Sequence, residues 1–235
     1  MNPFSVFIPV YNEEEIIVPN TDRLITYLDT LNTPYEIVIV SNGSTDKTPD
    51  LGTELQKKHE RVKFRHIAEK GPGGAIGTGV SMAAFENIIS VDMDLSVDLH
   101  FIDKANALLS LGYDVVVGSK RMGAQKRSFI RKTASTAFIM SAMLLLGLSF
   151  DDYSIAAKAY RKHVLERFKD SLVGGTFYVI ELLFNATRSN YDVVEIPAGC
   201  RDERKSKFNL MHEGIYRFSK LYNLWLKSVI LKKQN

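Results

Sequence analysis

The chain has 235 residues, of which 45% are hydrophobic and 24% charged, enough for one globular domain with a sizeable core. Its single cysteine excludes an internal disulfide framework and fits a reducing compartment. The net charge is only +3, but six basic residues and no acid lie between Gly118 and Phe150. Such a region can bind phosphate groups or an anionic membrane. A nucleic acid partner is not expected, because zinc-ligand spacings and aromatic RNA-binding motifs are absent.

The start of the chain and its most apolar stretch bear on membrane insertion. The N-terminus lacks a basic region followed by an apolar core, so no signal peptide is expected. The longest near-apolar stretch, residues 134–150, has 17 residues and contains serine, threonine and glycine. That length is marginal for a span of ~20 residues. We therefore expect an amphipathic or core helix here.

Short apolar runs alternate with helical patterns through the first half of the chain. Strands are predicted at 4–10, 36–40, 62–67, 88–91 and 114–117. A first helix is predicted from the acidic segment at 13–15 to about Leu31, and a later one over 98–111. Between them, the turn at 41–46 leads into a helix for which Ser44 or Thr45 is the expected N-cap.

The alternation predicts an α/β fold with a mostly parallel central sheet and helices on both faces. Ligands of such sheets bind beyond the carboxyl ends of the strands. Tyr11, Asn42 and Asp92 each fall at one of these ends. We therefore expect these three residues to line one crevice.

Asp92 and Asp94 follow the apolar run at 88–91 and are two positions apart. Alternate residues of a strand point the same way, so both carboxylates can face one cleft. Two hard oxygen ligands suit Mg²⁺ or Mn²⁺, with water and substrate phosphate completing the coordination shell. The alternative is a strand end that carries two solvated acids.

A glycine-rich loop at 70–79 enters a helix before the fourth strand. Glycines let the backbone approach a ligand closely, and a helix N-terminus attracts anions. The loop lacks the Gly-Lys-Ser/Thr ending of a P-loop and does not follow the first strand, so it matches neither that motif nor the dinucleotide fingerprint. Alone it is also compatible with a simple tight turn.

Taken together, these segments resemble family 2 glycosyltransferases, which have the A-type nucleotide-sugar-binding fold. The resemblance rests on Pro9–Glu13, Asn42–Asp46, the glycine-rich loop and Asp92–Asp94. Later segments are similar to polyprenyl-phosphate sugar synthases of the dolichol-phosphate mannose synthase type. These segments are Gly118–Lys120, Asp152–Ser154, Glu181–Leu183, Glu195–Pro197 and Arg201–Lys207. The resemblance covers about residues 4–210 and does not include the C-terminal membrane spans that many such enzymes carry.

The resemblance implies a metal-dependent, inverting transfer of a sugar from a nucleotide sugar to a polyprenyl phosphate or glycolipid. GDP-mannose is the first donor expected and a UDP-sugar the second. Asp94, Asp152 and Arg201 would be catalytic, and Asp92 with Asp94 would hold Mg²⁺ or Mn²⁺. The residues implied to bind the nucleotide and its metal are Pro9, Tyr11, Glu13, Val40, Asn42, Lys70, Gly71, Asp92, Met93, Asp94, Arg201 and Lys207.

The acceptor decides which further residues are needed. A phosphate acceptor is already anionic and needs cations, and the candidates are Lys120, Arg121, Arg127 and Arg131. A hydroxyl acceptor, such as a growing glycan, would need a general base, for which Asp152 is the best candidate. A third hypothesis is a non-catalytic nucleotide-sugar-binding or regulatory protein, against which the intact Asp-x-Asp argues.

The chain departs from the family pattern at several positions. Asn42 stands where an acid would hydrogen-bond the base, which leaves the choice between guanine and uracil open. Two arginines of the pattern are replaced by lysines, Lys120 and Lys158. A glycine of the pattern is replaced by Arg204, and a glutamine by Ser96. Most of these changes fall on the acceptor side of the expected site.

We expect a glycosyltransferase domain at residues 1–209 and a C-terminal amphipathic helical extension at 210–235. Apolar residues recur every three to four positions in this extension, with lysines nearby, as in basic helices that lie on anionic membranes. Packing on the sheet or a dimer contact is the alternative, and the oligomeric state stays open. The expected location is the cytoplasm, peripheral on the cytoplasmic face of the membrane.

Overall fold

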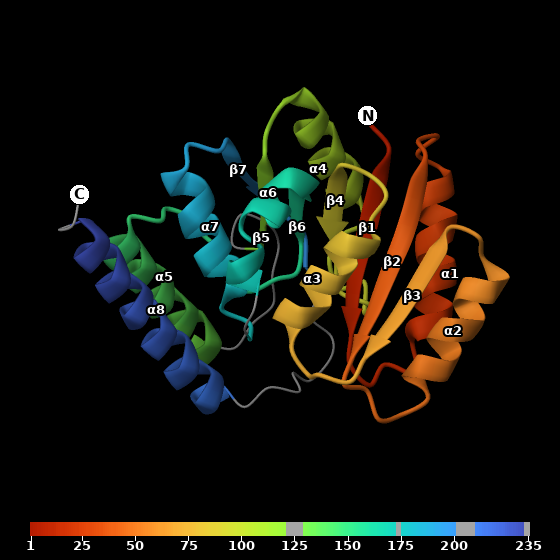
Figure 1. Cartoon of the computed structure of the whole chain (residues 1–235), viewed down its shortest axis with the longest axis horizontal. Coiled ribbons are helices and arrows are strands. Elements are labelled where there is room, and N and C mark those ends of the chain that lie inside the picture. The colour runs from red at the N-terminus through yellow and green to blue at the C-terminus, as the bar shows by residue number, and fades with distance from the viewer. Residues whose placement is uncertain (121–128, 173–174, 201–209, 233–235) are drawn as a thin grey trace.

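The computed structural model describes residues 1–120, 129–172, 175–200 and 210–232, without the side chains of 129–132, 210–213 and 230–232. A seven-stranded sheet with helices on both faces fills the centre of the described molecule (Figure 1). The order of its strands is β3-β2-β1-β4-β6-β5-β7. The predicted α/β class and central sheet are therefore confirmed.

The five predicted strands are all present, and two more follow them. The strands are β1 (Phe4–Val10), β2 (Tyr35–Asn42), β3 (Val62–Ile67), β4 (Asn87–Ser90), β5 (Val115–Ser119), β6 (Lys158–Arg161) and β7 (Val193–Pro197). The helices are α1 (Ile17–Asp29), α2 (Thr48–Lys58), α3 (Pro72–Met82), α4 (His100–Leu111), α5 (Phe129–Leu146), α6 (Lys162–Arg167), α7 (Tyr178–Arg188) and α8 (Leu210–Lys232), with a 3-10 turn at Lys169–Leu172.

All neighbouring strands pair in parallel except β6, which is antiparallel to both β4 and β5. The register places Lys158, the first residue of β6, opposite Ser90 of β4 and Val117 of β5. Because β6 runs in reverse, its amino end lies at the carboxyl ends of its neighbours. The reversed strand therefore delivers a lysine to the edge where ligands of such sheets bind.

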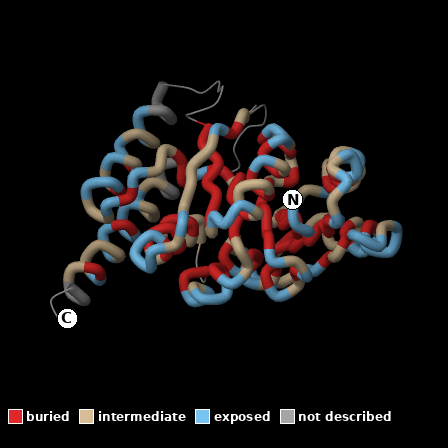
Figure 2. Tube along the Cα trace, turned by 90° about the horizontal axis from the view of Figure 1, so that it is seen from above, coloured by how far each residue is buried: buried red, intermediate tan, exposed pale blue. Residues whose placement is uncertain are grey.

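Alternate strand residues point to two separate cores, one on each face of the sheet. Ile37 and Ile39 of β2 pack with α1, α2 and α4, whereas Val38 and Val40 pack with α3 and α5–α8. Gly79 of α3 lies so close to β1 that a Cβ there would meet the Phe7 ring at 2.4 Å. Figure 2 shows the buried residues gathered in the sheet and the exposed residues on the outer helices.

The segment between β1 and α1 differs from its prediction. The helix begins at Ile17 rather than near Glu13, because residues 14–16 form a turn before it. The N-cap prediction for α2 is also wrong, since Lys47 precedes that helix and makes no side-chain cap. Ser44 Oγ instead accepts a hydrogen bond from the Asn12 backbone N–H at 3.0 Å, which ties the end of β1 to the end of β2.

Helices α5 and α8 run side by side at one end of the molecule (Figure 1). The rings of Phe138 in α5 and Phe218 in α8 meet edge to face, with centroids 5.3 Å apart. Their inner sides pack on α7 through buried residues such as Ala142 and Leu221. Within the described ranges, no helix combines the length and hydrophobicity needed to cross a bilayer.

Candidate active site

The carboxyl ends of β1, β2 and β3 meet along the lower edge of the molecule in Figure 1. Asn42 ends β2 there and is buried. Its side-chain N–H donates to the Val10 carbonyl at 2.9 Å, and its side-chain oxygen accepts from the Gly71 N–H at 3.3 Å. One amide side chain therefore holds β1, β2 and the glycine-rich loop together.

A cation and an aromatic ring lie beside this amide. The Lys70 ammonium is 4.0 Å from the centroid of the Tyr11 ring, within the range of a cation–π contact. Gly43 makes this approach possible, because its φ is +68° and a Cβ there would lie 3.0 Å from the Lys70 Cβ. The turn after β2 therefore requires glycine, and it sets the position of Lys70 over Tyr11.

Asp92 and Asp94 follow β4 at the same edge. Burial, together with the charge of Asp94, raises the pKa of Asp92 to about 6, although a backbone hydrogen bond from Ala156 and the charges of Lys120 and Lys158 act in the opposite direction. Asp94 Oδ1 accepts a hydrogen bond from the Ser96 N–H at 3.0 Å, which fixes the turn. The charge of Asp94 disfavours the ionised form of Asp92, and a bound cation would relieve this repulsion.

The donor set fits a divalent ion with an open coordination shell. Both side chains offer hard carboxylate oxygens, as Mg²⁺ and Mn²⁺ prefer. In the part of the chain that the structure describes, no cluster of three or more histidine, cysteine or acidic side chains could enclose a metal. A metal held by Asp92 and Asp94 would therefore take its remaining ligands from water and substrate.

A buried group of charges lies at the other half of the edge, formed by β5 and β6. The Lys120 ammonium is 3.7 Å from Asp152 Oδ2, and both side chains are almost fully buried. Asp152 Oδ1 accepts hydrogen bonds from the backbone N–H and the hydroxyl of Ser154, at 2.7 and 2.8 Å. Burial alone would raise the pKa of Asp152, but Lys120, Lys158 and the Ser154 hydrogen bonds lower it below its usual value.

These contacts make Asp152 poorly suited to act as a general base. A base needs a pKa near the working pH and an oxygen that can reach the substrate proton. Both oxygens of Asp152 are engaged, and its pKa is lowered. Lys120, expected to bind the acceptor, is itself buried against this carboxylate.

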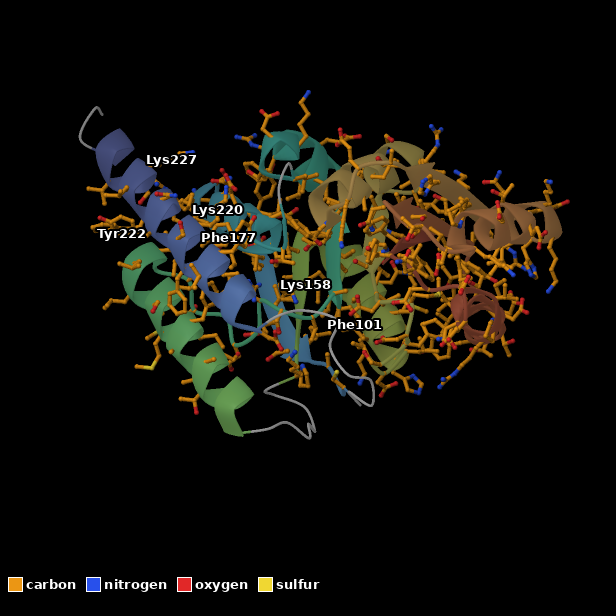
Figure 3. All side chains as sticks on the ribbon, turned by 90° about the horizontal axis from the view of Figure 1, so that it is seen from below. Phe101, Lys158, Phe177, Lys220, Tyr222 and Lys227 are labelled. Carbon is orange, nitrogen blue, oxygen red and sulfur yellow. The ribbon has the colours of Figure 1, made fainter. Side chains whose placement is uncertain are left out.

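Lys158 and Glu195 are functional candidates that sequence reasoning did not propose. The Lys158 ammonium donates to the carbonyls of Ile155 and Gly118 at 3.0 and 3.4 Å, and burial lowers its pKa to about 8. Figure 3 shows Lys158 in the middle of the sheet. Glu195 accepts from the backbone N–H groups of Asp151 and Asp152. A lysine inside the apolar run at 155–160 was the signal that could have found the first of them.

The remaining predicted residues divide into three groups. Val40 and Met93 are buried, so they offer a ligand only backbone atoms, and the Glu13 N–H donates to Thr48 Oγ1. His66 and His163 are exposed. Five basic residues lie outside the described positions or side chains and stay predictions: Arg121, Arg127, Arg131, Arg201 and Lys207.

Glu181 of α7 is half-buried, which raises its pKa. The charges of Lys227 and Lys220 in α8 act against this rise in pKa. Glu181 therefore interacts electrostatically with the C-terminal helix α8.

Sequence comparison places the chain among known transferases. The model of glycosyl transferase family 2 matches residues 5–169. The undecaprenyl-phosphate 4-deoxy-4-formamido-L-arabinose transferase of Serratia proteamaculans is 31% identical over 209 residues, which cover 88% of this chain and 63% of the relative. The enzyme of the same name from Proteus mirabilis is 31% identical over 226 residues, covering 95% and 66%. The chain thus spans somewhat less than two thirds of the length of these relatives.

Solved structures agree on the fold. Glucosyl-3-phosphoglycerate synthase from Mycobacterium tuberculosis, in complex with UDP, aligns with a TM-score of 0.70 at 17% identity, covering 95% of this chain and 80% of that one. The same enzyme in complex with Mn²⁺, UDP-glucose and phosphoglyceric acid also aligns with a TM-score of 0.70, at 15% identity and the same coverage. At this identity the likeness extends to the fold alone. The family match over most of the chain goes further, and this chain belongs to glycosyl transferase family 2.

Proposed function

We propose that the protein transfers a sugar from a nucleotide sugar to a polyprenyl phosphate, with inversion and with the help of a divalent metal. The observation that carries this proposal is the pair of acids after β4, where the pKa of Asp92 is raised beside Asp94. Tyr11, Asn42 and Lys70 lie at the neighbouring strand ends. This arrangement suits a ligand with a base at one end and a diphosphate at the other.

The chemistry is the departure of a nucleoside diphosphate, whose phosphate charge grows as the bond to the sugar breaks. A divalent ion, when bound, neutralises part of that charge as a Lewis acid. Asp92 and Asp94 would hold it, and Arg201 and Lys207 would add direct phosphate contacts, for which the guanidinium fork is well shaped. Tyr11 would contact the base, and Asn42 would hold the surrounding strand ends and glycine-rich loop in place.

A phosphate acceptor fits the other half of the edge better than a hydroxyl acceptor. A phosphate oxygen is already a nucleophile and needs no base, and Asp152 is poorly placed to be one. Lys158 and Lys120 keep Asp152 ionised, so this carboxylate positions the loop at 151–154. Arg121, Arg127 and Arg131 are the proposed contacts to the acceptor phosphate. The names of the relatives, which are undecaprenyl-phosphate transferases, support the same acceptor class.

The donor that we propose first is a uridine nucleotide sugar, with GDP-mannose, the first expectation from the sequence, as its competitor. The solved neighbours hold UDP or UDP-glucose, and the relatives transfer a formamido-arabinose, so neither supports mannose. Asn42 also bears on the choice. A carboxylate at this position would pair with the two adjacent N–H donors of guanine, whereas Asn42 has only one acceptor oxygen and already uses its amide on the Val10 carbonyl and the Gly71 N–H, which disfavours guanine.

Calorimetric titration tests the donor site. We would titrate UDP, GDP and their sugars, with and without Mn²⁺, into the wild type and Asp92→Ala. The expected result is Mn²⁺-dependent binding of UDP that Asp92→Ala abolishes. Preference for GDP would restore the mannose hypothesis, and no binding of any nucleotide sugar would refute the transferase proposal.

A second assay tests the acceptor. Transfer is measured to a prenyl phosphate and to a simple sugar hydroxyl, each with the nucleotide sugar that binds best. Product from the phosphate alone is expected. Product from the hydroxyl, lost in Asp152→Asn with an intact fold, would support a glycan-extending enzyme instead.

A further inference from the structure

The outer sides of α5 and α8 expose an unusual number of apolar side chains. Nine large hydrophobic side chains are exposed in the described part of the chain, and six of them lie on these two helices. They form what we call the α5/α8 apolar face: Met140 (59% exposed), Met143 (53%), Leu144 (85%), Ile215 (69%), Phe218 (41%) and Tyr222 (53%).

These side chains form one surface rather than scattered positions. Their spacing of three and four residues puts Met140, Met143 and Leu144 on one side of α5, and the same spacing holds for the three residues of α8. The contact between Phe138 and Phe218 joins the two helices at 5.3 Å. The inner sides already pack on α7, and apart from the contact of Phe218 the fold leaves the side chains of the α5/α8 apolar face exposed.

The charge around the α5/α8 apolar face is positive. No charged residue occurs from Thr133 to Phe150, and α8 carries four basic residues against the single acid Glu213. Figure 3 shows Tyr222 on the outer side of α8, with Lys220 and Lys227 on the side nearer α7. An anionic surface would be attracted to this end of the molecule, whereas a second copy of the chain would bring like charges together.

We propose that the α5/α8 apolar face docks on an anionic lipid bilayer and sets the orientation of the active site to it. This inference rests on the proposed function, because the phosphate of a polyprenyl phosphate lies at the headgroup level of a bilayer. Both helices start near the carboxyl edge of the sheet (Figure 1), so docking brings that edge to the headgroups. Tyr222 and Trp225, with ring centroids 5.6 Å apart, are the residue types that favour the bilayer interface.

Flotation with vesicles tests the proposal on the full chain. The vesicles contain phosphatidylcholine with or without phosphatidylglycerol, and the variant is Leu144→Glu. The matched control is Leu111→Glu, because Leu111 at the end of α4 is 79% exposed but belongs to another surface. We expect Leu144→Glu to weaken vesicle binding about tenfold or more, since it removes an inserted side chain, and Leu111→Glu to bind as the wild type does.

The charge component has its own pair of variants. Lys220→Glu/Lys227→Glu should remove the preference for phosphatidylglycerol, with a several-fold loss of binding. Lys57→Glu/Lys58→Glu makes the same charge change on α2 and should keep the preference. If both double variants lost the preference for phosphatidylglycerol equally, the effect would come from the net charge of the protein. That result would overturn the assignment of the preference to the lysines of α8.

Two further outcomes separate this inference from the proposed function. Leu144→Glu should keep its transfer rate to a short prenyl phosphate in solution and lose rate with a long-chain acceptor in vesicles. If neither the wild type nor any variant transfers sugar, but the flotation results are as expected, the docking proposal is supported and the proposed reaction is wrong. Docking on lipid would be overturned if the wild-type protein bound neither kind of vesicle. It would also be overturned if sedimentation showed a wild-type dimer that Leu144→Glu dissociates.

Discussion

The two halves of the carboxyl edge shift the pKa of an acidic side chain in opposite directions. After β4, Asp92 is partly buried beside another acid, and its pKa rises to about 6. After β5, Asp152 is buried, but Lys120 and Lys158 lower its pKa. Asp152 is the less exposed of the two, yet its pKa is the lowered one, so the neighbouring charges decide the direction of the shift. The acids after β4 would need a bound metal ion to balance their charge, whereas Asp152 is balanced by Lys120 and Lys158.

The largest effect should come from removing an acid of the first half. Asp94→Ala should lower the rate of sugar transfer about a thousandfold, because the departing diphosphate loses the site that holds its metal. Steady-state kinetics with Mn²⁺ measures this loss. Glu60→Ala, which removes an exposed acid before β3, serves as the matched control and should leave the rate unchanged. A rate near that of the wild type in Asp94→Ala would contradict the metal assignment.

Removing the negative charge of Asp152, which balances Lys120 and Lys158, should mainly lower the stability of the fold. Asp152→Asn leaves Lys120 and Lys158 buried without their carboxylate, which should cost about 3 kcal/mol in the free energy of unfolding. Denaturant titration measures the change. Asp152→Asn/Lys158→Met removes one of the two buried cations and should recover part of the loss. If the double variant were less stable than the single one, the proposed charge balance would be wrong.

The raised pKa of Asp92 predicts a pH dependence of metal binding. The metal binds the ionised carboxylate, so below pH 6 a proton must leave before Mn²⁺ can bind. The Mn²⁺ dissociation constant should therefore rise about tenfold for each pH unit below 6 and level off above it. The metal-free protein should show the linked effect: because the folded state binds this proton more tightly than the unfolded state, the contribution of Asp92 to stability falls as pH rises through 6. Calorimetry across this range measures the first effect, and a flat dissociation constant would exclude Asp92 as a ligand.

The smallest effect concerns the turn that places Lys70. Gly43→Ala should destabilise the fold by about 1 kcal/mol and weaken nucleotide binding, because its φ is +68° and the added Cβ would crowd Lys70. Gly77→Ala in α3 is the control, since nothing lies within 4 Å of its Cβ position and alanine is a better helix former. Thermal unfolding compares the two. Equal stability in both variants would mean that the turn is not constrained as described.

The first half of the edge could be predicted from the sequence because its signals are local. Each strand is a short apolar run, and Asp92 and Asp94 follow theirs directly. The second half could not, because β6 enters the sheet in reverse between β4 and β5, two consecutive strands that come well before it in the chain. Ser44 failed as a cap for a similar reason, since its partner, Asn12, belongs to another strand end. Pairings over long sequence distances leave no local pattern.

The reversed strand also imposes an order of assembly. Strands β1 to β4 are neighbours in the sheet and complete by residue 90, so they can associate as soon as that part of the chain is available. Strand β5 borders only β6 and β7, and it must wait for residues 158–161 before it joins the others. During synthesis the half of the sheet that contains β1 to β4 would therefore form first, and β5 would join it only when β6 pairs with β4.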